Sequence, residues 1–352
     1  YASSPHASIL NSYTRGYTWE NILSYNMTIA EDHSVGGTFV TSWSHNQEES
    51  NMAAGSGQDL DSWSFWRLTS ATSPHVESDF SQTQKLSYAV RFNYSYKGKY
   101  LFTFSNRWDG VSWLANKWDS FPAALAWRIS DEAFMESSND WLSNLKLRIG
   151  YGVTGNSGGI GAYGTLTNAI IYSSSGISIG GNNVPFAQYT GTYSNPDLGW
   201  EKSHNWNIGV DFGLLSNRID GSIEWFTTKT KGLLFKRTLP VTTGNTGWGR
   251  PLDIWENLAE TSNMGVEATI NSHNIKTKDF SWDTTLSFTW SKEKINSLPT
   301  GDLIKENLFE GQPIHALYDY KYAGIWGSNV PQETLDAYGV KPGWVKIETL
   351  DK

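Results

Sequence analysis

Two mirrored runs of alternating apolar and polar residues flank a Lys97–Gly98 pair in the segment 86–110. The first run places large apolar side chains on one face: Leu86, Tyr88, Val90, Phe92, Tyr94 and Tyr96. The second run continues this face after the pair with Tyr100, Phe102 and Phe104. Alternation with a period of two predicts β-strands, and a Lys-Gly pair between two such strands predicts a tight turn. The segment is therefore predicted to be a β-hairpin with one aromatic-rich face.

The same alternation recurs along the chain and predicts about eleven strands. The clearest further runs lie at 19–30, 35–47, 118–129, 145–154, 200–212, 218–225, 266–270 and 282–290. Mostly short turns, at about 31–34, 97–98, 130–144, 213–217 and 272–280, alternate with mostly long connections at about 48–82, 107–118, 155–199 and 230–260. This alternation is typical of outer-membrane barrels, which have short periplasmic turns and long extracellular loops. The 130–144 turn is the longest of the short set, and we expect a short helix in it.

Composition decides which solvent the aromatic face meets. The chain has 352 residues with 18 Trp, 17 Tyr and 15 Phe, yet it is only 38% hydrophobic and its mean hydropathy is −0.45. A soluble β-protein normally builds its core from Val, Ile and Leu, whereas membrane barrels carry aromatic girdles at both interfaces. No apolar run approaches the roughly eighteen residues of a membrane helix. We therefore expect an all-β, antiparallel transmembrane barrel whose aromatic face meets lipid.

The opposite face of the predicted strands is polar and carries charges of both signs. Its members are Arg91, Asn93, Arg128, Lys146, Arg148, Asn205, Asp211, Asp220, Glu224 and Glu267. A packed core could not accept so many charges, but a wide, wet lumen hydrates them. The net charge is −8 and Lys and Arg form no stripe, which argues against a nucleic-acid partner. The absence of cysteine excludes disulfides and thiolate metal sites.

Motifs associated with catalysis or cofactors are better explained as background. Segments 150–155 and 159–164 match GxGxxG, but no helical pattern follows to hold a pyrophosphate. Segment 176–180 matches GxSxG without the strand–turn–helix elbow that exposes a nucleophile. We therefore predict no catalytic residues and no bound nucleotide.

Metal ligation has only weak support in the sequence. The seven histidines are scattered without a paired spacing. The acidic residues Glu48, Glu49, Asp59 and Asp61 fall in a predicted extracellular loop. Paired carboxylates for glycoside hydrolysis are one interpretation of this group, but a solvated or Ca²⁺-binding loop is the better one. We expect no cofactor, with Ca²⁺ in the extracellular loops as the one possible ion.

Five segments, linked in order and spacing, carry a family resemblance. They are RFNYSYKGKYLFTFSNRWDG, FPAALAWRISDEAFM, WLSNLKLRIGYGVTGN, NPDLGWEKSHNWNIGVDFGLLSNRIDGSIEWFTTKTKGLL, and NMGVEATINSHNI followed by FSWDTTLSFTWSKEKINSL. Together they resemble the SusC/RagA family of TonB-dependent outer-membrane transporters of Bacteroidota, from about residue 18 to the end. The resemblance implies a large plugged barrel that imports glycans, peptides or other oligomeric nutrients. It also implies a SusD-like surface lipoprotein as a lid, and energy delivered by TonB through the plug.

The chain departs from this family in extent. These 352 residues contain no plug domain or Ton box, both of which we expect upstream of Tyr1, and the family continues beyond the final segment PGWVKIETLDK. The predicted strands are roughly half of the 22 or so in a plugged transporter. An open half-barrel would leave unpaired strand edges in lipid. We therefore expect residues 1–352 to be a partial barrel domain of a longer protein.

Tryptophans in or beside the long connections are the first candidate substrate contacts. Trp63, Trp66, Trp113 and Trp248 could stack on sugar rings or clamp a peptide, or they could pack against the lid protein. Trp108, Trp118 and Trp255 are better assigned to interfacial girdles or packing. On the lumen side, Arg91 and Arg148 are the candidate substrate contacts.

Three functions remain open at this stage. The first is energy-coupled import, and the second is a passive or purely structural barrel. The third is a secreted carbohydrate-binding β-protein, which would stay monodisperse without detergent. The sequence does not identify the substrate, because specificity lies in loops and the plug.

Overall fold

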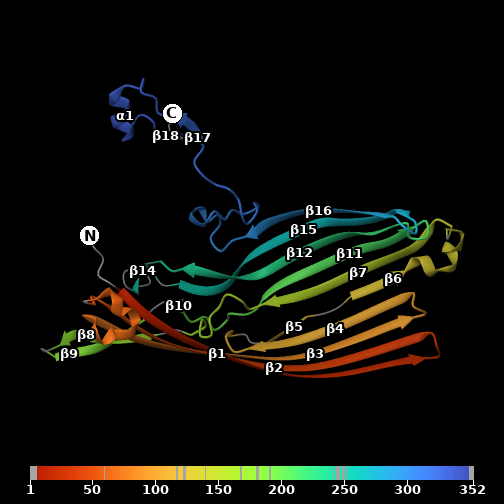
Figure 1. Ribbon diagram of the computed structural model, residues 1–352, viewed down its shortest axis with the longest axis horizontal. Helices are drawn as coiled ribbons and strands as arrows, with labels where there is room; N and C mark the ends of the chain where they lie inside the picture. Colours follow the sequence, from red (N-terminus) through yellow and green to blue (C-terminus); the bar gives the residue numbers. More distant parts are fainter. Residues whose placement is uncertain are drawn as a thin grey trace.

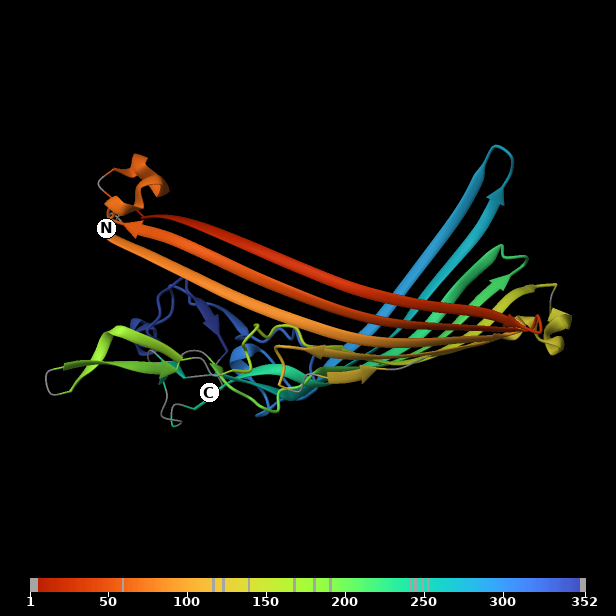
Figure 2. The same ribbon diagram turned by 90° about the horizontal axis from the view of Figure 1, so that it is seen from below.

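A computed structural model describes residues 6–348 except 59, 116–117, 122–123, 139, 167–168, 180–181, 190–191, 241, 243–245, 248–249 and 252. Its dominant feature is one twelve-stranded sheet that curves into an open trough (Figures 1 and 2). Ten strands follow one another along this wall: β1 (His6–Ile29), β2 (His33–Ser56), β3 (Ser73–Tyr96), β4 (Tyr100–Val111), β6 (Ala124–Arg128), β7 (Leu142–Asn156), β11 (Glu201–Leu214), β12 (Ile219–Thr238), β15 (Asp253–Lys276) and β16 (Ser281–Ser297). Every neighbouring pair among them is antiparallel, which confirms the predicted all-β fold class.

The remaining elements are mostly short. β5 (Trp118–Phe121) pairs with β4, and β10 (Thr192–Tyr193) runs parallel to β15. Three separate two-stranded sheets pair β8 (Ala169–Ile179) with β9 (Asn182–Tyr189), β13 (Thr246–Gly247) with β14 (Arg250–Pro251), and β17 (Tyr322–Ile325) with β18 (Val345–Ile347). The helical turns are η1 (Asp61–Ser70), η2 (Ile129–Asp131), η3 (Ala133–Ser138), η5 (Ile304–Glu306) and the α-helix α1 (Gln332–Tyr338). The α1, β17 and β18 group stands away from the wall in Figure 1.

Strand register sorts the side chains of the wall into two faces. One row of cross-strand partners takes one residue from each wall strand, and all ten are apolar or aromatic: Met27, Val35, Tyr94, Phe102, Leu125, Ile149, Ile208, Trp225, Val266 and Trp290. A neighbouring row on the opposite face is mostly polar or small: Thr28, Ser34, Ser95, Leu101, Ala126, Arg148, Gly209, Glu224, Glu267 and Thr289. We call these two sides of the sheet the outer face and the lumen face.

Within the described part of the chain, many large apolar side chains on the outer face are exposed. Phe92 is 41% exposed, Trp206 46% and Phe288 57%. Apolar side chains that are exposed in a continuous band around a barrel wall are the signature of contact with lipid. The predicted alternation of the two faces is therefore confirmed on all ten wall strands, in the part of the sheet that these rows cross.

The predicted hairpin around Lys97–Gly98 is also confirmed. Tyr96 pairs with Tyr100, and the amide of Lys99 donates to the carbonyl of Tyr96 at 3.0 Å. Lys97 and Gly98 both adopt left-handed backbone conformations, with φ of 52° and 68°. Two consecutive left-handed residues match the type I′ turn, whose twist suits the flanking strands.

Strand lengths differ from the prediction at the end that carries the long connections. β2 runs on to Ser56 and β3 begins at Ser73, so the predicted loop 48–82 is wrong and only 57–72 connects the strands. Likewise, the 107–118 and 230–260 connections shrink to 112–117 and 239–252. A 24-residue strand is about 80 Å long, far more than the 9–11 residues a membrane strand needs. Beyond the bilayer both faces of a strand meet water, so the apolar-polar alternation fades there.

The predicted strand 118–129 is divided. β5 and β6 lie on either side of residues 122–123, and both pair with β4. The turn that follows contains η2 and η3, which confirms the short helix expected in 130–144. Here Trp127 Nε1 donates to Glu132 Oε1 at 3.1 Å, and Lys99 Nζ lies 3.8 Å from Glu132 Oε2. Hydrogen bonds from Tyr100 and Trp127 hold the pKa of Glu132 below its usual range.

Among the described residues, no helix combines the length and the apolar character needed to cross a membrane.

Candidate functional site

The lumen face carries an ion-pair cluster on three adjacent strands. Arg148 on β7 donates from Nη2 to Asp211 Oδ1 at 2.7 Å and to Glu224 Oε1 at 2.6 Å, and its Nε lies 3.0 Å from Asp211 Oδ2. Asn207 donates to the other oxygen of Glu224 at 3.1 Å. The planar guanidinium binds Asp211 with two parallel N–H groups, a bidentate geometry that an ammonium group lacks, and still reaches Glu224.

Gly209 makes room for this cluster. It is the cross-strand partner of Arg148, and a Cβ at this position would lie 2.9 Å from Arg148 Nη2. The absence of a side chain on β11 therefore lets the guanidinium lie across the strand and reach Glu224 on β12. Arg148 is thus largely committed to the wall, with about 30% of its side chain exposed.

Arg91 has a different environment. It is exposed on the lumen face of β3, and within the described part of the chain it has neither an ion-pair nor a hydrogen-bond partner. It lines a groove of about 330 Å³ together with Thr38, Ser105 and Arg107. Arg107 pairs with Asp109, and its Nε lies 2.9 Å from Oδ2. Of the two arginines that line this groove, Arg91 is therefore the one available to a ligand.

A second polar cluster joins the middle of β3 to the C-terminal end of β4. The carboxylate of Asp109 is buried and accepts hydrogen bonds from Ser87 and Arg107, and Lys85 Nζ lies 3.4 Å away. Two cations and a hydroxyl around one buried carboxylate satisfy its lone pairs, so this cluster fixes the wall near the long connections.

The long connections pack together into a small hydrophobic cluster. Val111, Leu114, Leu198 and Trp200 are buried there, with Trp113 and Trp255 packed against them. Asn257 ties the base of this cluster, because its amide donates to the carbonyls of Gly199 and Gly232 at 3.1 and 2.8 Å. The loops at this end therefore have a core of their own.

Beside this cluster lies a cavity of about 590 Å³ between the 112–115, 160–166 and 194–196 segments. None of the described residues that line it is charged. Its polar members include Gln82 and Thr165, and its apolar members include Leu114, Tyr163 and Leu166. The side chains of Tyr163 and Leu166 are 41% and 55% exposed. Sequence reasoning missed this cavity, because it treated the 159–164 segment only as a glycine pattern.

The three candidate tryptophans that the structure describes do not converge on one site. Trp63 and Trp66 lie on η1, at the far tip of β2 and β3; Trp66 is 82% exposed and its ring lies 4.6 Å from that of Phe65. Trp113 instead packs in the loop cluster, and its Nε1 donates to the carbonyl of Ser157 at 2.9 Å. Trp248 lies outside the described residues.

Other sequence motifs adopt structures without the required chemistry. The 176–179 part of the GxSxG match lies within β8, and 150–155 lies within β7, so neither opens a helix. Glu48 and Glu49 lie on β2 instead of in a loop, Asp61 lies on η1, and Asp59 lies outside the described residues. Within the described part of the chain, no group of three or more His, Asp or Glu side chains is arranged to hold a metal ion.

Known proteins are similar to this chain in sequence and in fold. The family model "TonB dependent receptor-like, beta-barrel" matches residues 1–343. TonB-dependent receptor P3 of Formosa agariphila is 33% identical over 94% of this chain and 34% of its own length. TonB-dependent receptor SusC of Bacteroides thetaiotaomicron is 34% identical over 86% of this chain and 31% of its own length. The chain thus spans about a third of the curated relatives it matches.

A solved structure of the RagAB peptide importer in its open-open state superimposes with a TM-score of 0.78 at 22% identity, covering 98% of this chain and 37% of that one. Another, of the RagAB peptide transporter, gives a TM-score of 0.76 at 23% identity, over 91% of this chain and 35% of that one. At this level of identity the likeness concerns the fold. Together with the family match over nearly the whole chain, the two-faced wall shows that this chain belongs to the TonB-dependent receptor-like β-barrel family.

Proposed function

We propose that this chain forms part of the wall of an outer-membrane importer for oligomeric nutrients, energised through TonB. The observation that carries this proposal is the pair of adjoining rows on the sheet, one apolar and one mostly polar, each crossing all ten wall strands. Such a wall separates lipid from a wet passage. TonB-dependent receptor is also the name given to the curated relatives that match this chain.

The substrate class that we propose is a glycan or a peptide. Arg91 is an exposed cation of the lumen face suited to a carboxylate or hydroxyl group, and Trp66 is an exposed stacking surface at the loop end. The uncharged cavity beside Tyr163 suits an uncharged part of the nutrient. Arg148 and Trp113, which have partners within the wall and the loops, would shape the passage more than they contact the cargo.

The partner that we propose is a SusD-like surface lipoprotein at the loop end, with TonB acting through a plug domain of the whole protein. Exposed apolar side chains at the tip support this, including Leu60 at 51% and Trp66 at 82%. Apolar side chains gathered at a protein tip commonly mark a protein contact. Purification of the full-length protein in mild detergent should then yield a second, soluble-fold polypeptide in stoichiometric amount.

Uptake in living cells tests the transport proposal. A strain lacking the gene is complemented with the full-length protein and fed fluorescent oligosaccharides or peptides. We expect accumulation that stops when an uncoupler collapses the proton gradient or when TonB is deleted. Accumulation that persists under both treatments would identify a passive barrel instead.

We further propose that the nutrient crosses chemically unchanged. Incubation of the purified protein with candidate oligosaccharides and peptides, followed by mass spectrometry, should show no products. Turnover that disappears in a Ser178→Ala variant would identify a hydrolase.

A further inference from the structure

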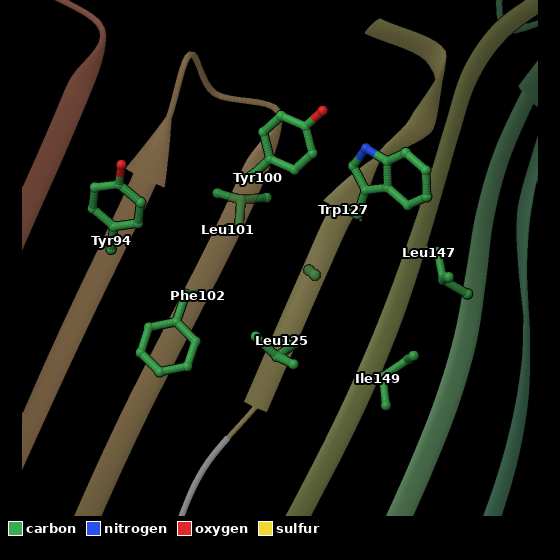
Figure 3. Close-up of a pocket in the computed structure, with 9 residues that line it drawn as sticks. Tyr94, Tyr100, Leu101, Phe102, Leu125, Trp127, Leu147 and Ile149 are labelled. Atoms are coloured by element: carbon green, nitrogen blue, oxygen red, sulfur yellow. The ribbon is translucent and has the colours of Figure 1, made fainter. Parts of the chain in front are cut away.

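An apolar groove crosses the outer face near the turn end of β4, β6 and β7. It has a volume of about 450 Å³. Figure 3 shows Tyr100 and Phe102 from β4, Leu125 and Trp127 from β6, and Leu147 and Ile149 from β7 around it. Strand register explains the arrangement, because these side chains form two adjacent rows, Tyr100–Trp127–Leu147 and Phe102–Leu125–Ile149.

Side chains along the groove remain open on the side facing away from the lumen. Leu125 is 53% exposed, Phe102 38% and Ile149 38%. All three belong to the outer face, so the substrate passage lies on the other side of the sheet. An empty apolar groove of this size forfeits dispersion contacts along its lining, and hydrocarbon is the medium that restores them.

Polar groups gather at one end of the groove only. The rings of Tyr96 and Tyr100 stack at 6.2 Å, and those of Tyr100 and Trp127 also lie 6.2 Å apart. Trp127 donates from Nε1 to Glu132 in the following turn at 3.1 Å. In Figure 3 the hydroxyl of Tyr100 points toward the ring nitrogen of Trp127. An aromatic belt with its polar atoms toward a turn marks the level of lipid headgroups. The groove therefore runs from the headgroup level of the periplasmic side into the hydrocarbon.

The charged side chains at this end of the groove limit which lipid headgroup fits there. Three ion pairs lie in these turns: Lys97–Asp32, Lys99–Glu132 and Arg128–Asp131. Recognition of an anionic lipid uses clusters of Lys or Arg that are free to contact it. Since each of these three cations already has an acidic partner, a headgroup without net charge fits this surface better.

We propose that this groove is a binding site for one acyl chain of a zwitterionic phospholipid of the periplasmic leaflet. The proposal rests on the placement of the wall in the outer membrane proposed above. The headgroup lies beside Tyr100 and Trp127, and the chain lies against Phe102, Leu125 and Ile149. The lipid is a resident of the barrel wall and not a cargo, so nutrient uptake and lipid retention are separate measurements.

The test uses the full-length protein extracted from outer membranes in mild detergent, with bound phospholipid counted by native mass spectrometry. Phosphatidylethanolamine is added as the probe, and phosphatidylglycerol is compared with it. The Leu125→Trp variant obstructs the groove, and Ile223→Trp is the control. Ile223 lies on the same face of β12, away from the groove, and is 49% exposed.

We expect phosphatidylethanolamine to be retained by the wild type and by Ile223→Trp, and retention to fall about tenfold in Leu125→Trp, the change expected when the burial of one leucine-sized surface is lost. Equal retention in both variants overturns the proposal, and so does equal retention of phosphatidylglycerol. Heat-modifiable migration on gels checks that each variant is folded. If the wild type retains phosphatidylethanolamine but does not take up the nutrient, the proposed transport function is wrong and the proposed lipid site still stands.

A second measurement uses photolabelling of the wild-type protein. Phosphatidylethanolamine with a diazirine in the middle of one acyl chain is incorporated into vesicles with the wild-type protein and photolysed. We expect adducts on peptides containing Phe102, Leu125 or Ile149 to exceed those on the equally lipid-facing Ile223 and Leu286. Uniform labelling overturns the site. Efficient Leu125→Cys cross-links between two copies would also overturn it, because they would assign the groove to a protein interface.

Discussion

At the scale of single residues, the two candidate arginines of the lumen face differ in what holds them. Arg148 joins two carboxylates from neighbouring strands, whereas Arg91 has no partner in the described part of the chain. In the sequence the two look alike, because each is a basic residue at a strand position that faces the lumen. What separates them is the cross-strand environment, and that depends on which residue of a distant segment lies opposite. Gly209 beside Arg148 is such a residue.

This difference predicts that the two arginines contribute unequally to stability. Arg148→Ala leaves Asp211 and Glu224 close together without their shared cation, and we expect it to lower the free energy of unfolding by about 1–3 kcal/mol. The matched control Arg91→Ala should change it by less than about 0.5 kcal/mol. Urea unfolding of the full-length protein in lipid vesicles, followed by tryptophan fluorescence, measures both. A cost for Arg91→Ala equal to that for Arg148→Ala would contradict the cluster.

At the scale of the element, the hairpins are held by their turns as well as by register. Gly98 is left-handed at φ 68°, and a Cβ added there would meet nothing within 4 Å; Gly37 has equally open space without a positive φ. The Gly98→Ala substitution should therefore cost about 1 kcal/mol from backbone strain alone. Gly37→Ala should be neutral or stabilising, because Ala loses less conformational entropy than Gly on folding. Equal effects in the same unfolding assay would argue against a type I′ turn.

Element boundaries show where sequence reasoning holds and where it fails. Inside the bilayer the alternation is enforced by two different solvents, and so the strands near Phe92, Ile149 and Trp206 are predictable. Outside the bilayer, segments such as 48–56 and 229–238 form strands without that pattern, because both of their faces meet water. Only pairing with neighbouring strands reveals them.

The sequence likewise predicts one part of the candidate site and misses another part. Lumen parity placed Arg91 and Arg148 on the correct face, since it follows from strand alternation alone. The loop cluster was not predictable, because Trp113 and Leu198 lie in connections whose sequences show no strand period. Their contact joins parts of the chain more than eighty residues apart in sequence, and no local pattern encodes such a contact.

At the scale of the whole molecule, the long connections gather at one end of the wall and the tight turns at the other (Figure 2). By the general rule for outer-membrane barrels, the long connections are extracellular. An epitope tag inserted between Gly158 and Gly159 should therefore be stained on intact cells, whereas a tag between Lys97 and Gly98 should not. Both tags should be stained after permeabilisation. The reverse pattern on intact cells would mean that the wall is inverted.

The most direct test of the two-faced wall is a site-by-site map of which solvent each residue of β3 meets. The sequence has no cysteine, so single cysteines at positions 88–95 can be spin-labelled cleanly in the full-length protein if the rest of it is also cysteine-free. Collision with oxygen, which concentrates in lipid, and with a water-soluble nickel complex is then measured in vesicles. We expect labels at Tyr88, Val90, Phe92 and Tyr94 to favour oxygen, and labels at Ala89, Arg91, Asn93 and Ser95 to favour nickel. Accessibility without this period of two would contradict a wall with lipid on one side and water on the other.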